Sequence, residues 1–306
     1  MSFYIGVFVF AGIYGILAMS FTLVHGTAGM FTVAHAVFFG IGAYAAASIG
    51  HGLPPGFVLF DIIAAVIITV AVAVPVAVVA LRERGQYMML VTFSTQIVFS
   101  VALLNIAYFG GEDGLGGIQP LRIGNLIANG PIASLVVVYV LLILVYFLLR
   151  YIEHSALGRL LRAIREDELA AEAFGADVWG AKLIAFVASA GLAGFAGALF
   201  AHYSGYISPA SFSFQIAILI VTISVLGGQY SMIGAALGAV VVIWMPYLIE
   251  MVGFQSVHVA ALTQLLYGVL IIVILFLRPE GLVRERVKLY TEVAMERRGG
   301  RGDEPA

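Results

Sequence analysis

The sequence contains no cysteine and few charged residues, and these two absences narrow the classes of protein that it can encode. None of its 306 residues is Cys, and only 10% are Asp, Glu, Lys or Arg. Without Cys the chain cannot form disulfides, use thiol chemistry or hold a metal through thiolates. With 62% hydrophobic residues, the composition is typical of a multi-pass membrane protein and leaves no room for a second, soluble domain.

Motifs of soluble chemistry are missing as well. The sequence has no G-x-x-x-x-G-K-[ST] loop for nucleotide phosphates and no H-E-x-x-H pair, and its six His are scattered rather than spaced as metal ligands. We therefore expect a protein that is not an enzyme, with no catalytic residue, no metal, no cofactor of its own and no nucleic-acid partner. The N-terminal segment lacks a basic region and a cleavage site, so we interpret it as a retained span.

Apolar runs separated by short polar turns predict an all-α transmembrane bundle with about nine spans, within a range of about eight to ten. The runs cover residues 3–24, 31–49, 57–81, 87–109, 132–151, 183–203, 212–226, 232–252 and 259–277. The run at 212–226 is short for a span and precedes Gly-Gly-Gln-Tyr-Ser, so we expect one short, broken or partly re-entrant helix there. Small residues in the runs at 31–49, 183–203 and 232–252 predict close packing between helices.

The basic residues are distributed unevenly, and their positions predict the orientation of the chain. Fourteen of the fifteen Lys and Arg fall in three groups, at 82–84, 150–182 and 278–301. With about nine spans, all three groups lie on one side, which the positive-inside rule assigns to the cytoplasm. The N-terminus is then outside, the C-terminus is cytoplasmic, and Arg122 is the lone base in an outer loop. Two fewer spans near the C-terminus would leave this orientation unchanged. The rule therefore predicts the orientation of the chain more firmly than the number of spans.

The membrane domain, 1–277, is interrupted by one long charged stretch, 153–182, and followed by a charged, solvated tail, 278–306. Within the stretch, Asp167 is a good N-cap and Gly175 is a residue type favoured just past helix ends, so we expect a helix of about two turns between them. Its apolar face consists of Leu169, Ala170, Ala173 and Phe174, flanked by Glu168 and Glu172. A helix this short is marginal alone in water, so we expect a partner surface to hold it.

An alternative for this stretch is a helix that lies at the lipid interface. Arg159, Arg162 and Arg165 would then meet anionic head groups. A short, tightly capped helix between two spans can instead be gripped by a partner and pass its displacement to the membrane helices. The residues alone leave both interpretations open.

Polar side chains inside the apolar runs are candidates for a translocation path. Those we select are His35, Thr92, Thr95, Gln96, Asn105 and Gln215, with Ser224 and Gln264 as further candidates. For each of them, the alternative is a hydrogen bond between helices, worth about 0.6 to 2 kcal/mol. The run at 87–109 is unusually polar for lipid, so at least one of its faces should meet protein or water.

Two other functional classes are open at this point. An ion-coupled secondary transporter would place acids near the middle of the membrane, whereas the only acid within a predicted span, Asp61, lies near its outer end. An intramembrane enzyme would need a convergent set of groups, and nothing in the spacing of His35 and Ser94 singles them out. Both classes are therefore weaker alternatives.

Several blocks of the sequence resemble one family of transport proteins. They read HGTAGMFTVAHAVFFGIGAYAAA at 25–47, LRERGQYMMLVT at 81–92, GGEDGLGGI at 110–118, LGRLLRAIREDELAAEAFGADVWGAK at 157–182, SVLGGQYSMIGAALGA at 224–239 and LRPEGL at 277–282. Together and in this order, they are similar to blocks of the branched-chain amino acid ABC transporter permeases of the LivM type. The resemblance extends over nearly the whole chain.

This resemblance implies a role, a set of partners and a location. The chain would be one of two permease subunits, beside a sister permease of the LivH type, in a multi-pass importer of the bacterial inner membrane. Two ABC ATPase subunits would hydrolyse ATP, and a periplasmic binding protein would deliver leucine, isoleucine or valine. Scattered neutral polar groups in an apolar path suit such a solute. Another small polar solute, such as urea, a short amide or an aromatic acid, is the alternative.

The resemblance also implies that the stretch at 153–182 holds the coupling helix, equivalent to the E-A-A-x-x-x-G loop of ABC importers. Ala170, Ala171 and Gly175 match that pattern, whereas Leu169 occupies the leading Glu position and the acid lies one residue earlier. The residues expected to couple to the ATPase are Glu168, Leu169, Ala170, Ala171, Glu172, Phe174 and Gly175.

Overall fold

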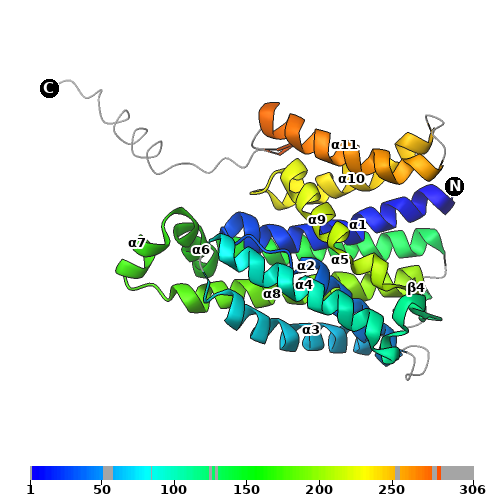
Figure 1. Cartoon of the computed structure of the whole chain (residues 1–306), viewed down its shortest axis with the longest axis horizontal. Helices are drawn as coiled ribbons and strands as arrows, with labels where there is room; N and C mark the ends of the chain where they lie inside the picture. The colour runs from blue at the N-terminus through cyan, green and yellow to red at the C-terminus, as the bar shows by residue number, and fades with distance from the viewer. Residues whose placement is uncertain are drawn as a thin grey trace.

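The computed structural model describes residues 2–50, 58–83, 85–123, 126–127, 130–251, 256–277 and 281–283, and long helices dominate it (Figure 1). Each predicted apolar run holds one of these helices. They are α1 (Ser2–Thr22), α2 (His35–Gly50), α3 (Val58–Ala80), α4 (Gln86–Asn105), α5 (Pro131–His154), α8 (Val178–Ser204), α9 (Phe214–Gly227), α10 (Met232–Met251) and α11 (Ser256–Leu277). Most of the predicted tail lies outside the described residues.

Six helical segments in the described part of the chain are long and apolar enough to cross a membrane. They are α1 with the π-helical turn η1 (Leu23–Thr27), α3, α4, α5, α8 and α10. α2 and α9 are apolar but shorter, with 16 and 14 residues. These helices confirm the prediction of an all-α, polytopic membrane protein. The number of spans and the orientation of the termini stay predictions.

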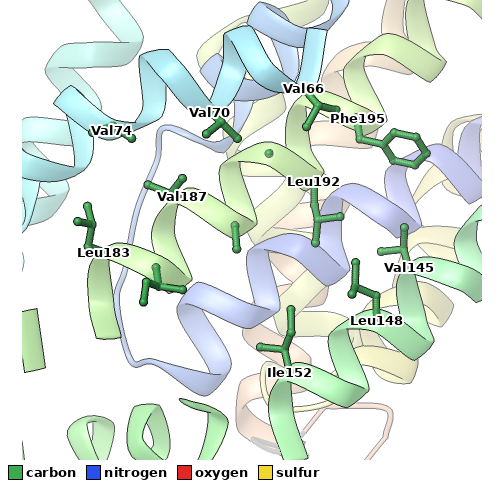
Figure 2. Close-up of a pocket in the computed structure, with 13 residues that line it drawn as sticks. Val66, Val70, Val74, Val145, Leu148, Ile152, Leu183, Val187, Leu192 and Phe195 are labelled. Carbon is green, nitrogen blue, oxygen red and sulfur yellow. The ribbon is translucent and has the colours of Figure 1, made fainter. Parts of the chain in front are cut away.

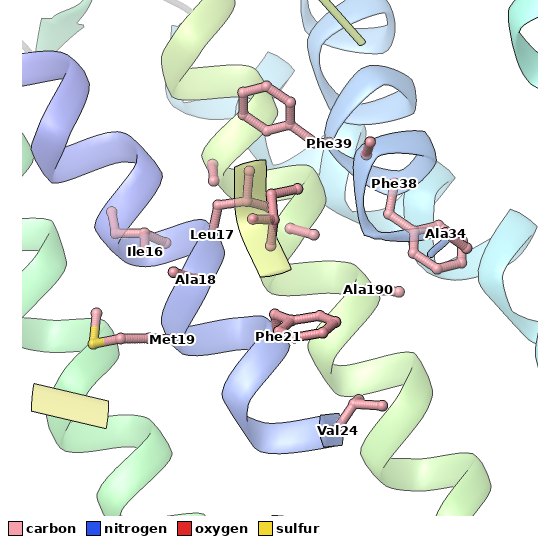
Figure 3. Packing of buried hydrophobic residues seen from close by; sticks show 14 of the residues in the cluster. Ile16, Leu17, Ala18, Met19, Phe21, Val24, Ala34, Phe38, Phe39 and Ala190 are labelled. Atoms are coloured by element: carbon pink, nitrogen blue, oxygen red, sulfur yellow. The ribbon is translucent and has the colours of Figure 1, made fainter. Parts of the chain in front are cut away.

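α1 lies at the centre of the bundle. In the most apolar 18 residues of α1 and η1, 89% of the residues are buried inside the structure. The corresponding share is 22% in α4 and 22% in α5. Ile16, Leu17 and Phe21 are fully buried, and Figure 3 shows them among the surrounding helices. The outer helices instead present large apolar side chains outward, as expected of helices that face lipid or another subunit.

α2 and α8 cross at glycine positions that leave no room for side chains. A Cβ on Gly42 of α2 would clash with the backbone of Gly194 of α8, and a Cβ on Gly197 would clash with the carbonyl group of Phe39. Small residues allow such close approach of membrane helices because neither backbone is held apart by side chains. The packing faces predicted for these two runs are confirmed.

Short elements gather at one end of the bundle, near the label β4 in Figure 1. They are β1 (Leu115–Gly116), β2 (Arg122–Ile123), β3 (Leu126–Ile127), β4 (Tyr206–Ile207) and the 3-10 turns η2 (Ala107–Phe109), η3 (Gly111–Asp113) and η4 (Pro209–Phe212). β1 pairs antiparallel with β4, and β2 with β3, where the sequence predicted only turns. α4 ends before the predicted Phe109 because Ile106 has an extended backbone, with φ −91° and ψ 109°.

The basic residues of the described chain lie at the ends that the charge pattern predicts. Arg82 lies two residues past the end of α3, and the charged stretch begins at the end of α5. Both therefore lie at the end of the bundle that carries α6 (Ala156–Glu166) and α7 (Glu168–Ala173) (Figure 1). Arg122 lies in β2, at the other end. For the bases to lie at these ends, long helices that follow one another in the sequence must run in opposite directions, as consecutive membrane spans do.

Candidate functional site

The charged stretch folds into two short helices, and each begins at a side-chain cap. Ser155 Oγ accepts a hydrogen bond from Gly158 N at 3.4 Å at the start of α6. Asp167 Oδ1 accepts one from Ala170 N at 3.0 Å at the start of α7. Such caps satisfy backbone N–H groups that the first turn leaves unpaired. The N-cap predicted at Asp167 is confirmed.

The C-terminal end of α7 is fixed just as firmly. Gly175 has a φ of +81°, a conformation that side chains disfavour and glycine adopts freely. Its N–H donates to Glu172 O at 2.9 Å, and the next N–H, of Ala176, donates to Ala171 O at 3.2 Å. This pair of bonds is the Schellman arrangement of a helix end. Since Asp177 then caps α8, α7 is held in a stiff loop between two caps.

One side of α7 is attached to the bundle. Ala171 is buried, with 8% of its surface exposed. Glu168 forms an ion pair with Lys182 of α8, with 2.5 Å between the carboxylate oxygen and Nζ. In α6, Leu161 and Ile164 are buried. Movement of α7 should therefore be passed directly to α6 and α8, because packed side chains resist compression.

The other side of α7 is open. Phe174 is 93% exposed and Leu169 is 64% exposed, and the exposed Glu172 lies between them in the sequence. A fully exposed aromatic ring next to an exposed leucine, at a bundle end rich in charges, is typical of a surface that another protein covers. We define this surface, Leu169, Glu172 and Phe174, as the α7 face.

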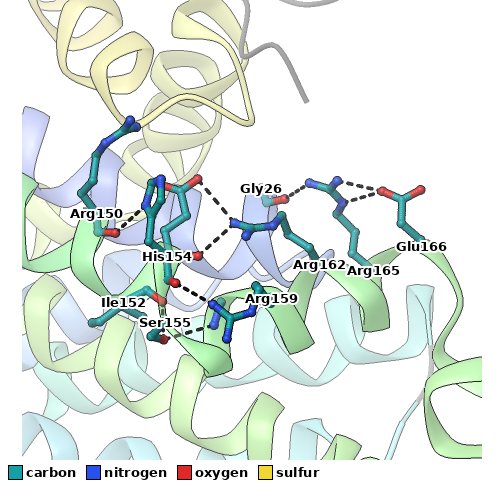
Figure 4. A network of polar contacts seen from close by, with 11 residues as sticks. Gly26, Arg150, Ile152, His154, Ser155, Arg159, Arg162, Arg165 and Glu166 are labelled. Carbon is teal, nitrogen blue, oxygen red and sulfur yellow. Dashed lines mark hydrogen bonds and ion pairs between the residues drawn. The ribbon is translucent and has the colours of Figure 1, made fainter. Parts of the chain in front are cut away.

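Two arginines of α6 bind carbonyl oxygens at the end of α5 (Figure 4). Arg159 Nη1 donates to His154 O at 3.0 Å, and Arg162 Nη1 donates to Glu153 O, also at 3.0 Å. The Glu153 carboxylate lies 4.0 Å from the same Arg162 nitrogen. These bonds tie α6 to α5, so the Arg162 guanidinium contacts groups of the protein itself, whereas the lipid-interface interpretation expected a head-group contact. Arg159 remains exposed.

Arg165 connects α6 to two distant parts of the chain. Its Nη1 donates to Gly26 O of η1 at 2.6 Å (Figure 4). Its guanidinium carbon lies 4.7 Å from the ring centre of Tyr230, in the turn between α9 and α10. Its Nη2 donates to Glu166 at 2.7 Å. A charge-assisted bond and a cation–π contact thus converge on one side chain that is only 16% exposed.

The two segments that Arg165 reaches also touch each other. His25 Nε2 lies 3.3 Å from Gln229 Oε1, and a Cβ on Gly26 would clash with the carbonyl oxygen of Gln229. We call these four residues with Arg165, namely His25, Gly26, Gln229 and Tyr230, the Arg165 junction. The junction was not predicted from the sequence, although its members lie in three of the blocks that resemble the transporter family, because nothing in the sequence pairs residues so far apart.

A small cavity lies between the junction and α7. Its volume is about 220 Å³, and its wall includes Gly29, Glu83, Arg165, Glu168 and Lys182. The cavity therefore has the Glu168–Lys182 pair on one side and the Arg165 guanidinium on the other. Charged groups of α6, α7 and α8 thus face one shared space at this end of the bundle.

His35, a candidate for the translocation path, lies inside the bundle. Its Nε2 is 2.7 Å from Ser189 Oγ of α8, and that hydroxyl donates to Ser20 O of α1, also at 2.7 Å. His35 is 2% exposed and Ser189 is fully buried. The chain of bonds joins three helices, which favours the helix-to-helix alternative for His35.

Thr92 and Gln96 are buried on the inner face of α4. Thr92 Oγ1 accepts a hydrogen bond from Val33 N at 3.2 Å. Gln96 Nε2 donates to Phe212 O at 2.8 Å. Both bonds attach α4 to the segments that precede α2 and α9, so these two side chains also fit the helix-to-helix alternative.

Three other path candidates, Thr95, Asn105 and Gln215, lie toward the outside of the subunit. Thr95 is half-buried and Asn105 is exposed, and each donates to a carbonyl oxygen of its own helix four residues earlier, at 2.9 and 2.8 Å. Gln215, at the start of α9, is exposed. The chain by itself does not bring these three residues together into one site. A path that uses them would therefore need a second protein surface as its other wall.

The buried acid Asp61 has a partner. Its Oδ1 lies 3.1 Å from His202 Nε2 of α8, and the other ring nitrogen of His202 lies 2.7 Å from Gln119 O. The pair is at the end of the bundle opposite α7. Asp61 is therefore used to join α3 to α8, which agrees with the expectation that it is not an ion-coupling group in the middle of the membrane.

Comparison with known families decides what kind of protein carries this site. Residues 3–275 match the family described as branched-chain amino acid transport system / permease component. The chain belongs to this family. The matched residues include nearly all of α1 and α11 and every element between them, so the α7 face and the Arg165 junction lie inside a permease component.

Individual relatives agree with the family. The permease component is 30% identical to the high-affinity branched-chain amino acid transport system permease protein LivM of Escherichia coli K12, over 92% of this chain and 71% of that protein. It is 30% identical to BraD of Pseudomonas aeruginosa, over 88% and 91%. LivH of Escherichia coli K12 is 27% identical, over 74% and 79%. Among solved structures, none shows a significant match.

Proposed function

We propose that this permease component is a membrane-spanning subunit of an ATP-driven importer that carries leucine, isoleucine and valine across the bacterial inner membrane. Its partners would be a sister permease of the LivH kind, two ABC ATPase subunits that hydrolyse ATP, and a periplasmic binding protein. Support comes from the names of its relatives, two of which, LivM and LivH, denote different permeases of one transport system. The end that carries α6 and α7 would be cytoplasmic and the N-terminus outside, with about nine spans.

The observation that carries this proposal is the α7 face. Phe174 and Leu169 are exposed on a helix that is too short to be stable alone, yet both ends of that helix are capped. A partner that covers this face would bury an aromatic anchor, and such anchors supply much of the binding energy of protein interfaces. We assign the partner as an ATPase subunit and α7 as the coupling helix.

Force from the ATPase would reach the membrane by two routes. The first is direct, through the buried Ala171 and the Glu168–Lys182 pair into α8. The second passes through α6 and the Arg165 junction to the end of α1 and to the turn between α9 and α10. Because most of α1 is buried among its neighbours, a shift at its end would alter the packing of those neighbours together.

The path itself would form between this subunit and its sister. α4 carries Thr95 and Asn105 on surfaces that the rest of the chain does not fully cover, and Gln215 is exposed in the first turn of α9. Neutral polar groups among aliphatic side chains suit a solute with a charged backbone and an apolar end. Specificity would then lie mainly with the binding protein.

The experiment is uptake of radiolabelled leucine, isoleucine and valine into liposomes that contain this chain with the ATPases, sister permease and binding protein encoded beside it. We expect uptake that requires both ATP and binding protein. Stimulated ATP hydrolysis without uptake of these three amino acids would refute the substrate and leave the importer, and urea, a short amide and an aromatic acid would then be tested. Absence of both activities would refute the importer.

A further inference from the structure

A wide aliphatic groove runs along the surface between α3, α5 and α8. Its volume is about 740 Å³, within the range of roughly 300–1,000 Å³ that small-molecule sites occupy. The walls are side chains of Val, Leu, Ile and Phe, and Figure 2 shows them pointing into one shared space from the three helices. Gly191 belongs to the floor, where the missing side chain deepens the groove.

The three helices around the groove are all long and apolar enough to span a membrane. The groove covers only part of their length: on α5 it begins at Val145 and ends at Ile152, two residues before the helix ends. On α8 it begins at Leu183, near the start of the helix. On α3 its lining residues, Val66 to Val74, lie in the middle of the helix. The groove therefore extends from the middle of the bundle toward the end that carries α6 and α7, and we call that end of the groove its mouth.

Two side chains at the mouth have the chemistry of a lipid head-group site. Trp179 is 47% exposed and precedes Leu183 by four residues, so both lie on the same face of α8. Tryptophan is enriched where membrane helices meet the head groups. Arg159 is exposed, and its bond to His154 O holds it close to Ser155 and Ile152 at the end of α5 (Figure 4). A guanidinium there offers a positive charge and several donors to a phosphate.

We propose that this groove binds an anionic glycerophospholipid, with an acyl chain between α3, α5 and α8 and the head-group phosphate at Arg159 and Trp179. An acyl chain is the occupant because the walls offer only aliphatic and aromatic surface. The outward polar side chains that a second subunit could contact, such as Thr95, Asn105 and Gln215, are instead on α4 and α9. The lipid would brace α8 at the point where it receives α7.

The two tryptophans of the sequence, Trp179 and Trp244, make the proposal measurable. The probe is the full chain with Trp244→Phe in nanodiscs of phosphatidylcholine, to which phosphatidylglycerol with brominated acyl chains is added in small steps. Bromine quenches tryptophan fluorescence at close range. We expect quenching of Trp179 to saturate at a low fraction of phosphatidylglycerol, and brominated phosphatidylcholine to quench only in proportion to its abundance.

Two pairs of variants separate this site from ordinary contact with the bilayer. Ala188→Phe fills the groove, whereas Ala71→Phe adds the same ring to an exposed position of α3 that does not line it. Arg159→Gln removes the charge at the mouth, whereas Arg150→Gln removes an exposed charge of α5 that does not line the groove. We expect Ala188→Phe to weaken the saturable quenching at least tenfold, and Arg159→Gln to reduce the preference for phosphatidylglycerol about fivefold. Both controls should behave as the parent.

Equal quenching by the two lipids, or equal effects of each variant and its control, would overturn the proposal and leave only non-specific boundary lipid. A second measurement covers the assembled transporter, with a photoactivatable phosphatidylglycerol and mass mapping of the labelled peptides. Labelling of α5 and α8 peptides that Ala188→Phe removes supports the site. Labelling absent from these peptides in the complex would show that protein, not lipid, fills the groove. Arg159→Gln changes an exposed side chain and removes one hydrogen bond, to His154 O, so we expect this variant to fold even if Ala188→Phe does not.

Discussion

Arg165 is the residue on which the most separate interactions converge. Its partners, Gly26 and Tyr230, lie far from it in the sequence and belong to different helical hairpins. The charge pattern predicts a cytoplasmic loop for Arg165, but charge does not say which carbonyl group a guanidinium will reach. The caps of α7 were predictable because Asp167 and Gly175 act on groups within a few residues of themselves.

Arg165→Gln should uncouple ATP hydrolysis from uptake. The change removes the charge-assisted bond to Gly26 O, a kind of bond worth about 1.5–3 kcal/mol, together with the cation–π contact to Tyr230. We expect ATP hydrolysis stimulated by binding protein to persist and uptake per ATP to fall about tenfold or more. Arg150→Gln, at an exposed position outside the junction, is the matched control. Uptake per ATP that stays equal in the two variants would exclude the junction as a route of force.

Phe174→Ala should weaken the association with the ATPase while leaving the permease folded, because the ring is 93% exposed. Truncating an aromatic anchor typically costs about 2 kcal/mol or more, which is roughly a thirtyfold loss of affinity. The measurement is co-purification of the ATPase at increasing salt and detergent. Phe147→Ala, at a 63% exposed ring of α5, is the control, and an equal yield of ATPase from both variants would contradict the assignment.

At the scale of elements, the long helices were predictable and their interruptions were not. Apolar runs identify spans because the bilayer requires about 20 apolar residues with every backbone group paired. The π-helical η1, the early end of α4 at Asn105 and the pairing of β1 with β4 depend instead on contacts between distant segments. The path candidates show the same limit: polarity within a run located Thr92 and Gln96, but it could not show that both side chains face inward.

Gly175→Pro should disrupt the C-terminal cap of α7. Proline needs a φ near −65°, whereas the backbone here has a φ of +81°, and the Gly175 N–H that donates to Glu172 O would be lost. We expect the permease to insert normally and uptake to fall to near background. Gly175→Ala, which keeps the N–H and strains only φ, should give an intermediate loss. If insertion and uptake of the proline variant both match the parent, α7 does not need its C-terminal cap.

The crossing of α2 and α8 should be intolerant of even one added methyl group. A Cβ on Gly197 would clash with Phe39 O, whereas a Cβ on Gly268 of α11 meets nothing within 4 Å. We expect Gly197→Ala to lower stability by about 1–3 kcal/mol, as overpacking does, and Gly268→Ala to leave it unchanged. Thermal unfolding of the two variants in the same detergent is the measurement. An equal Tm would mean that the helices can separate freely at this crossing.

For the whole molecule, the two ends of the bundle carry different groups of side chains. The end with α6 and α7 gathers Arg82, the charged stretch and the α7 face, whereas the opposite end holds the short paired strands and the Asp61–His202 pair. Composition predicted the membrane class, and the distribution of bases predicted this asymmetry. The number of subunits and the faces between them depend on partner chains, which the residues of one chain only imply.

The most direct test of the account uses the absence of cysteine, which allows single-cysteine variants without a prior cysteine-free background. Phe174→Cys and Glu172→Cys would be assembled with a cysteine-free ATPase and treated with a short maleimide–succinimide linker that captures neighbouring lysines. Tyr206→Cys, 49% exposed at the opposite end of the bundle, is the control. We predict that both α7 variants cross-link to the ATPase, with yields that change when ATP is added, and that Tyr206→Cys does not. Cross-linking from Tyr206→Cys without any from α7 would contradict the orientation and the coupling role together.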